Sequence, residues 1–196
     1  MATIRLLTQK KRGKKKEYTL TICGRDGKDQ TYQIGSLIEL IWGIENPAAI
    51  INKIADKNIH IITLTITEGG YNIAKATNEF MLDNENIKYD LAHPQSPKTT
   101  FGFVAEGLRK RKAVGNGPIT ILSCDNLQHN GNTARKAFLS FFQAQDPELA
   151  EWATVNITFP NSMVDRITPS TQPEDIIRLN TQNGTQDGAP VYCEDF

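Results

Sequence analysis

The stretch from Pro118 to Gly131 constrains the fold of this 196-residue chain more than any other. Four apolar or β-branched residues, Ile119 to Leu122, run without interruption into a small polar cluster at 123–126, and an amphipathic segment follows. That order predicts a buried strand, a turn and then a helix. Ligands of an open α/β sheet bind outside the carboxyl ends of its strands, so we expect chemistry at the polar cluster.

Asn126 is the first candidate in this cluster. Its amide can donate a hydrogen bond to a carbonyl or alkoxide oxygen and stays neutral at any working pH. The alternative is that Asp125 and Asn126 only end the strand and cap the following helix, as such residues commonly do. The residues alone leave both interpretations open.

A second strand is predicted at Ile59 to Ile66. Its residues are nearly all apolar or β-branched, so we expect it to be covered on both faces. It runs into Thr-Glu-Gly-Gly-Tyr at 67–71, where two glycines allow the backbone to approach a ligand closely. Glu68 is therefore a candidate acid/base or proton-relay carboxylate. A solvated loop carboxylate without a catalytic role is the alternative.

The remaining pattern alternates strands with helices. Residues 18–23 and 30–35 flank turn residues and predict a β-hairpin. Helices are expected to begin after Asn46, near Ser96 or Thr99, at about Asn130 and after Asp146, whereas residues 83–97 indicate a loop. We therefore expect an α/β fold with a mostly parallel sheet, right-handed crossovers, flanking helices and an N-terminal β-hairpin. No linker separates two complete domains.

Charge and hydropathy argue against several kinds of partner. The 22 basic and 22 acidic residues cancel, so no net field draws the chain to nucleic acid or a membrane. The basic run Lys10 to Lys16, in a segment at 1–17, is expected to be solvated. No apolar stretch reaches spanning length and no signal peptide is visible, so we expect a cytoplasmic location. Three widely spaced cysteines fit reduced thiols rather than disulfides or a zinc site.

Five long stretches carry a resemblance to a known family. They are Leu64–Tyr71, Asp90–Pro94, Pro97–Gly102, Ser123–Gly131 and Phe159–Pro169. Together they resemble the long-chain mannitol dehydrogenase family of NAD-dependent polyol dehydrogenases and hexuronate reductases. The resemblance implies a partial Rossmann-type cofactor domain over residues 18–196, a helical substrate domain that is absent from this chain, and no metal.

The resemblance also implies roles for particular residues. The asparagine that matches Asn126 helps to form an oxyanion hole, and the glutamate that matches Glu68 is associated with proton movement to solvent. Four further residues are expected near the cofactor: Val164 and Asp165 close to nicotinamide and substrate, and Ser123 and Cys124 in contact with the cofactor.

Two features of the family are not recognisable in this chain. No glycine-rich turn for the pyrophosphate precedes Tyr18, and the catalytic lysine would lie beyond Phe196. We expect part of an NAD-dependent enzyme that interconverts a sugar alcohol and a ketose; the basic run alone speaks for NADP, which is less favoured. The alternative is a truncated, catalytically inactive relative. The particular polyol or hexuronate and the oligomeric state stay open.

Overall fold

The computed structural model describes residues 5–6, 17–37, 39, 41–43, 45–164 and 166–195, the first two by their backbone alone. The chain divides into two compact units, Met1–Arg5 with Ile41–Val164 and Leu6–Leu40 with Asp165–Phe196. The basic run Lys10 to Lys16 lies outside the described residues. The expected domain bounds, 1–17 and 18–196, stay a prediction.

The larger unit is built on a three-stranded parallel sheet. Its strands are β5 (Ile61–Leu64), β6 (Ile119–Ser123) and β7 (Ile157–Thr158), in the order β5-β6-β7. Residue Ile61 pairs with Thr120, and Ile119 pairs with Ile157. The central β6 is the buried strand that the sequence predicts. Two short strands, β1 (Arg5–Leu6) and β4 (Ile41–Trp42), form a separate two-stranded sheet.

The prediction that the strand at 59–66 is covered on both faces is wrong. The observed β5 is shorter, and Ile61 keeps 56% of its surface exposed. Within the described sheet β5 pairs with β6 alone, so it is an edge strand. Its sequence has the composition of an interior strand, but composition does not reveal how many neighbours a strand has.

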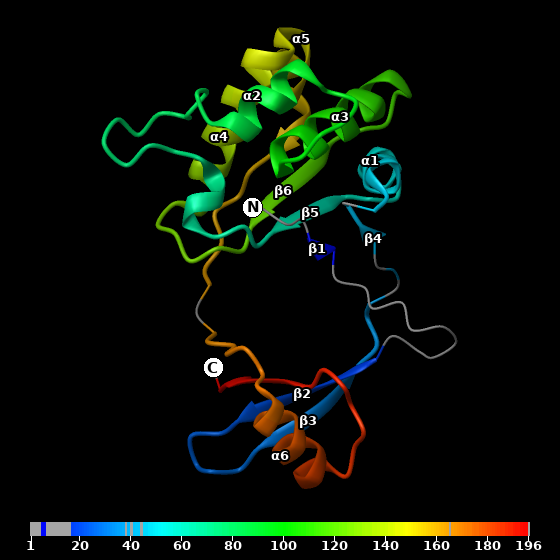
Figure 1. The fold of residues 1–196 in the computed structure, drawn as a ribbon, viewed down its shortest axis with the longest axis vertical. Coiled ribbons are helices and arrows are strands. Elements are labelled where there is room, and N and C mark those ends of the chain that lie inside the picture. The colour runs from blue at the N-terminus through cyan, green and yellow to red at the C-terminus, as the bar shows by residue number, and fades with distance from the viewer. Residues whose placement is uncertain are drawn as a thin grey trace. The chain divides into compact units, whose positions relative to one another are not determined.

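The structure describes five α-helices in this unit, drawn with its strands in Figure 1. They are α1 (Pro47–Ala55), α2 (Glu85–Ala92), α3 (Thr100–Ala113), α4 (Asn130–Gln145) and α5 (Pro147–Asn156). Three predicted starts are confirmed by side-chain caps: Asn46, Thr99 and Asp146 accept from the backbone amides of Ala49, Gly102 and Leu149. A short 3₁₀ turn, η1 (Glu68–Tyr71), follows β5.

The loop predicted at 83–97 contains helix α2, so that prediction is wrong. The Asn84 side chain caps the helix by accepting from the amides of Asn86 and Ile87. The helix buries little more than Ile87 among its apolar residues, which leaves too weak a periodic pattern to detect in the sequence.

The core of this unit joins helices to the sheet through aromatic rings. Phe101 of α3 stacks near Phe138 and Phe141 of α4, with ring centroids 4.9 and 5.8 Å away. Helix α3 also approaches α1 closely, because a Cβ on Gly107 would lie 2.6 Å from the side chain of Ile54.

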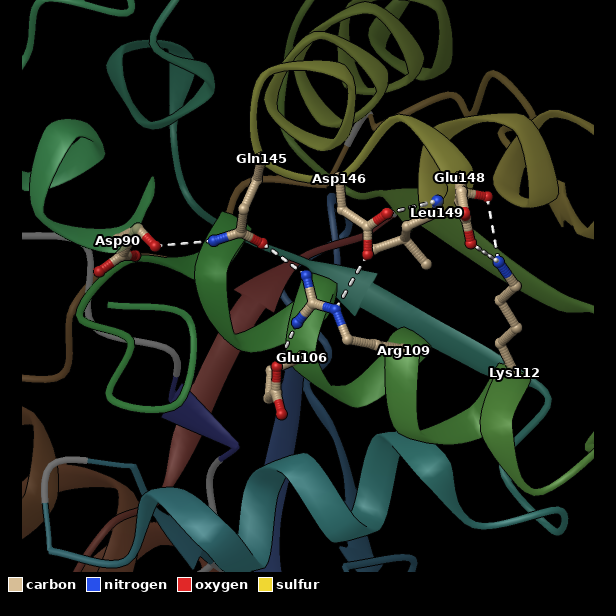
Figure 2. A network of polar contacts seen from close by, with 8 residues as sticks. All are labelled: Asp90, Glu106, Arg109, Lys112, Gln145, Asp146, Glu148 and Leu149. Carbon is tan, nitrogen blue, oxygen red and sulfur yellow. Dashed lines mark hydrogen bonds and ion pairs between the residues drawn. The ribbon is translucent and has the colours of Figure 1, made fainter. Parts of the chain in front are cut away.

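A polar network ties α3 to the junction of α4 and α5 (Figure 2). Arg109 contacts Glu106, donates to Asp146 at 3.0 Å and donates to Gln145 at 3.0 Å. Gln145 in turn donates to the backbone carbonyl of Asp90 at 2.7 Å. Burial alone would raise the pKa of Asp146, but the Leu149 amide and Arg109 outweigh it and hold that pKa below its ordinary value.

Among the described residues, the smaller unit has its own sheet and one α-helix. Strands β2 (Tyr18–Cys23) and β3 (Gln30–Ile34) form the predicted antiparallel hairpin, and β8 (Val191–Glu194) pairs with β2 in parallel. Helix α6 (Pro173–Asn183) contacts the sheet through Asn183, which donates to Thr21 at 3.1 Å. No helix in the described part of the chain is both long enough and apolar enough to cross a membrane.

Candidate functional site

The carboxyl ends of β5 and β6 lie side by side and are joined by a carboxylate. Asp125, two residues beyond β6, accepts from the backbone amides of Ile66 at 3.1 Å and Thr67 at 2.8 Å. The amide of Cys124 extends the sheet by donating to Leu64 at 2.8 Å. The turn after β5 and the polar cluster after β6 therefore form one surface at the edge of a parallel sheet, where ligands of such folds bind.

Tyr71 supports this junction from the interior. Its phenol donates to Asp125 at 2.7 Å and lies 2.5 Å from the hydroxyl of Ser123. Because the single phenol proton goes to Asp125, the Ser123 hydroxyl is the donor in the second contact. Tyr71 and Ser123 are fully buried. Burial is the main cause that raises the pKa of Tyr71, so the phenol stays protonated at ordinary pH.

The helix after β6 is not capped by the residues that the alternative interpretation assigns. Neither Asp125 nor Asn126 caps α4; the amides of Gly131 and Asn132 donate to Asn161 at 2.9 and 3.2 Å. The residue before the helix, His129, has a left-handed backbone and no side-chain cap bond. The predicted capping of α4 is therefore wrong, whereas β6 does end just before these residues, at Ser123. Asn126 is exposed beyond that end.

The segment after β7 packs over the start of α4. Asn130 is buried and donates to the carbonyls of Ser123 and Ser162, at 3.3 and 3.0 Å. The Ser162 hydroxyl donates to the Ser123 carbonyl at 2.5 Å. Gly131 allows this approach, since a Cβ there would lie 2.3 Å from the carbonyl oxygen of Pro160. Three stretches far apart in sequence thus meet at one edge of the sheet.

The structure locates all but one of the residues predicted for the site. Asn126 and Glu68 are exposed on the two adjacent turns, and Glu68 forms an ion pair with Lys75 at 3.1 Å. Val164 is half-buried at the end of the larger unit, while Asp165 lies outside the described residues. No distance joins Val164 to the two turns, so its place near nicotinamide stays a prediction.

Ser123 and Cys124, which are predicted to contact the cofactor, differ in burial: Ser123 is fully buried and Cys124 is half-buried. The Ser123 hydroxyl is engaged with Tyr71. The Cys124 thiol is half-buried, and its pKa is raised by burial and by the nearby Asp125. The thiol is therefore protonated and a poor nucleophile at neutral pH. A cofactor contact by either residue stays a prediction.

A cavity of about 280 Å³ lies beside the turn after β5. Its polar lining is made of neutral amide and hydroxyl side chains: Thr67, Asn72, Asn84, Asn86, Thr99 and Thr100. Gly69 and Gly70 contribute backbone to its wall. Neutral donors and acceptors of this kind suit the hydroxyl and amide groups of a ligand better than a phosphate group.

Sequence reasoning missed the residues that hold the site together. Tyr71, Asn130 and Asn161 act through partners 30 or more residues away. The motifs contain them, but a single sequence does not show which partners they meet. For Asp125 the sequence predicts only a strand end or a helix cap.

The residues at this sheet edge fit the nicotinamide end of a cofactor better than its pyrophosphate. Nothing lies within 4 Å of the position that a Cβ on Gly69 would take, so a ligand can reach the backbone of this turn. In the part of the chain that the structure describes, no glycine-rich turn opens an α-helix directly after a strand, as a pyrophosphate cradle would. Those residues also gather no cluster of three or more potential metal ligands.

Comparison with known proteins gives a consistent match over nearly the whole chain. A family model described as the mannitol dehydrogenase Rossmann domain matches residues 4–196. The polyol:NADP oxidoreductase of Gluconobacter oxydans (strain 621H) is 46% identical over 179 residues, which are 91% of this chain and 37% of that protein. The D-mannonate oxidoreductase of Escherichia coli (strain K12) is 38% identical over 185 residues, 93% of this chain and 38% of that protein.

Two solved structures share the fold. A D-sorbitol dehydrogenase in substrate-free form superimposes with a TM-score of 0.90 at 46% identity, covering 93% of this chain and 38% of that one. The mannitol 2-dehydrogenase of Pseudomonas fluorescens, in a ternary complex with NAD and D-mannitol, also gives 0.90, at 42% identity and 93% and 37% coverage. The predicted α/β, Rossmann-type fold is confirmed. The chain spans less than two fifths of the length of these relatives.

Proposed function

Because this chain belongs to the mannitol dehydrogenase family, we propose that it supplies part of the cofactor domain of an NAD-dependent dehydrogenase. The enzyme would interconvert a sugar alcohol and a ketose. The observation that carries the proposal is the junction at the sheet edge: exposed Asn126 and the Glu68 turn, joined through Asp125, inside the region that the family model matches.

In this proposal Asn126 acts on the reacting oxygen. Its amide N–H donates to the carbonyl oxygen of the ketose, or to the alkoxide formed from the sugar alcohol, and the hydrogen bond strengthens as negative charge develops there. The amide is exposed and is not used to cap α4, so it is available to a ligand. A bound nicotinamide cofactor supplies the hydride chemistry.

Glu68 is proposed to move the proton toward solvent. Its carboxylate is exposed on the turn after β5 and pairs with Lys75, which is also exposed. A carboxylate in this position can accept a proton near the site and release it to water. The proposal places Val164 and Asp165 beside nicotinamide and substrate, and Ser123 and Cys124 near the cofactor, as the family resemblance implies.

NAD is the cofactor we propose. One similar structure is a complex with NAD, whereas a relative of similar identity is named a polyol:NADP oxidoreductase. The only sequence feature that favours a 2′-phosphate is the basic run at Lys10 to Lys16, so NADP is the second choice. A cytoplasmic location also stays a prediction.

The second candidate is a catalytically inactive relative of the same fold. The observation that favours it is the lack of a pyrophosphate cradle in the described residues, because a fold without its full site does not confer the activity.

Calorimetric titration of the purified chain with NADH, and then with NADPH, separates these two candidates. We expect saturable micromolar binding of NADH and weaker binding of NADPH. A folded chain that binds neither cofactor would contradict the proposal and favour the inactive relative. Tighter binding of NADPH would keep the dehydrogenase proposal and reverse the cofactor preference.

A further inference from the structure

The turn that carries Glu68 begins with a residue in an unusual backbone conformation. Thr67 has φ 64° and ψ 168°, a region of the backbone map that is occupied almost only by glycine. A β-branched side chain makes this conformation especially unfavourable. Thr67 is also exposed, so packing of its own side chain does not hold it in place.

Asp125 holds the amide of Thr67, whose carbonyl accepts from the Gly70 amide at 3.1 Å within the turn. One carboxylate oxygen of Asp125 accepts from the Thr67 amide at 2.8 Å, and the other accepts from Ile66 at 3.1 Å and from the Tyr71 phenol at 2.7 Å. The carboxylate thus binds the two amides that enter the turn and the side chain that ends it. Hydrogen bonds to a charged acceptor are the stronger kind.

From this geometry we propose that Asp125, supported by Tyr71, is a positioning residue that holds the Thr67–Tyr71 turn in its strained form. The turn then sets the position of Glu68 relative to Asn126, which follows Asp125 in the chain. Strain of this kind at a site is retained when surrounding contacts over-determine it. The functional part of this inference rests on the function proposed above.

We call the hydrogen bonds of Asp125 to Ile66, Thr67 and Tyr71 the Asp125 clamp. Hydrogen exchange followed by NMR tests this clamp without any ligand. In the Asp125→Asn variant, we expect the amides of Ile66 and Thr67 to exchange at least about tenfold faster than in the wild type. The core amide of Cys124, which donates to Leu64, should keep its rate. Asp83→Asn removes an exposed carboxylate and is the control, because it should change none of these three exchange rates. Unchanged exchange at Ile66 and Thr67 would overturn the clamp.

Tyr71→Phe provides a milder variant, in case Asp125→Asn fails to fold. It keeps the aromatic ring in the core and removes only the hydroxyl group that donates to Asp125. We expect exchange at Ile66 and Thr67 to rise severalfold, less than in Asp125→Asn. No rise in this variant would also count against the clamp.

The positioning role is tested by NADH affinity and by rescue. Asp125→Asn should weaken NADH binding about tenfold, and adding Thr67→Gly should restore most of the loss, since glycine adopts the same backbone without strain. Thr67→Gly alone is the control for stability, because it relieves the same strain in the wild type. The gain in NADH affinity that Thr67→Gly gives to Asp125→Asn must exceed the gain that it gives to the wild type. If Asp125→Asn binds NADH as tightly as the wild type although its Ile66 and Thr67 amides exchange faster, Asp125 has no positioning role. If the wild type binds no NADH, the proposed function fails while the exchange data still decide the clamp.

Discussion

At the scale of single residues, the exposed amide of Asn126 gives the sharpest test of the chemistry. If activity is restored by adding a complementary substrate domain, Asn126→Ala should reduce turnover about a hundredfold or more, the scale of losing an oxyanion donor. The measurement is kcat by the absorbance of NADH. Gln128→Ala, two residues further on and also exposed, is the matched control and should keep wild-type turnover. Unchanged turnover in Asn126→Ala would contradict its assigned role.

The buried phenol of Tyr71 predicts how stability responds to alkaline pH. Its pKa is raised in the folded state, mainly by burial, whereas the unfolded chain ionises near pH 10. Above about pH 10 the unfolded state releases the proton that the folded state keeps, so the free energy of unfolding falls as pH rises.

Urea unfolding from pH 8 to 11 measures this effect. Tyr71→Phe should cost about 1–2 kcal/mol at neutral pH because a buried hydrogen bond is lost. Its free energy of unfolding should fall less steeply than that of the wild type above about pH 10. Parallel curves for the two proteins would show that Tyr71 does not carry the pH dependence.

At the scale of elements, the buried guanidinium of Arg111 joins the end of α1 to the start of β6. It donates to the carbonyls of Asp56 and Gly117 at 2.7 Å, and further bonds reach the carbonyls of Ile54 and Pro118. Arg111→Met removes these donors and should lower the free energy of unfolding by at least about 3 kcal/mol in urea titrations. Arg135→Met changes an exposed arginine on α4 and should stay within about 0.5 kcal/mol.

Gly131 tests the packing of the segment after β7 against α4. A Cβ there would lie 2.3 Å from the Pro160 carbonyl oxygen, so Gly131→Ala must displace the backbone and should cost about 1–3 kcal/mol in thermal or urea unfolding. Gly117→Ala is the control, because nothing lies within 4 Å of its added Cβ. Equal stability of the two variants would mean that this close approach is not required.

The sequence predicted those helices and strands that are marked by residues adjacent in the chain. Side-chain caps at Asn46, Thr99 and Asp146 marked three helix starts, and alternating residues marked the hairpin of β2 and β3. The exposure of Ile61 and the capping of α4 by Asn161 were not predictable in this way. Both depend on which segments meet in space, which local pattern does not encode.

At the scale of the whole molecule, the grouping of the chain into units also depends on distant contacts. Strand β2 pairs with β8, whose residues lie about 170 positions away in sequence, and both belong to the smaller unit. The sequence predicted a mostly parallel α/β fold but not this return of the chain to its early hairpin. The site, by contrast, lies wholly in the larger unit as far as the structure describes it, at the ends of β5 and β6.

We propose that this sheet edge binds the nicotinamide end of the cofactor, and NMR titration of the labelled chain with NADH shows which residues the cofactor contacts. We predict saturable shifts of the amide signals at 66–70 and 124–127, with smaller changes elsewhere. If the signals at these two turns do not move in a folded chain, or the shifts are confined to residues 18–34 and 173–194, this edge of the sheet does not bind the cofactor.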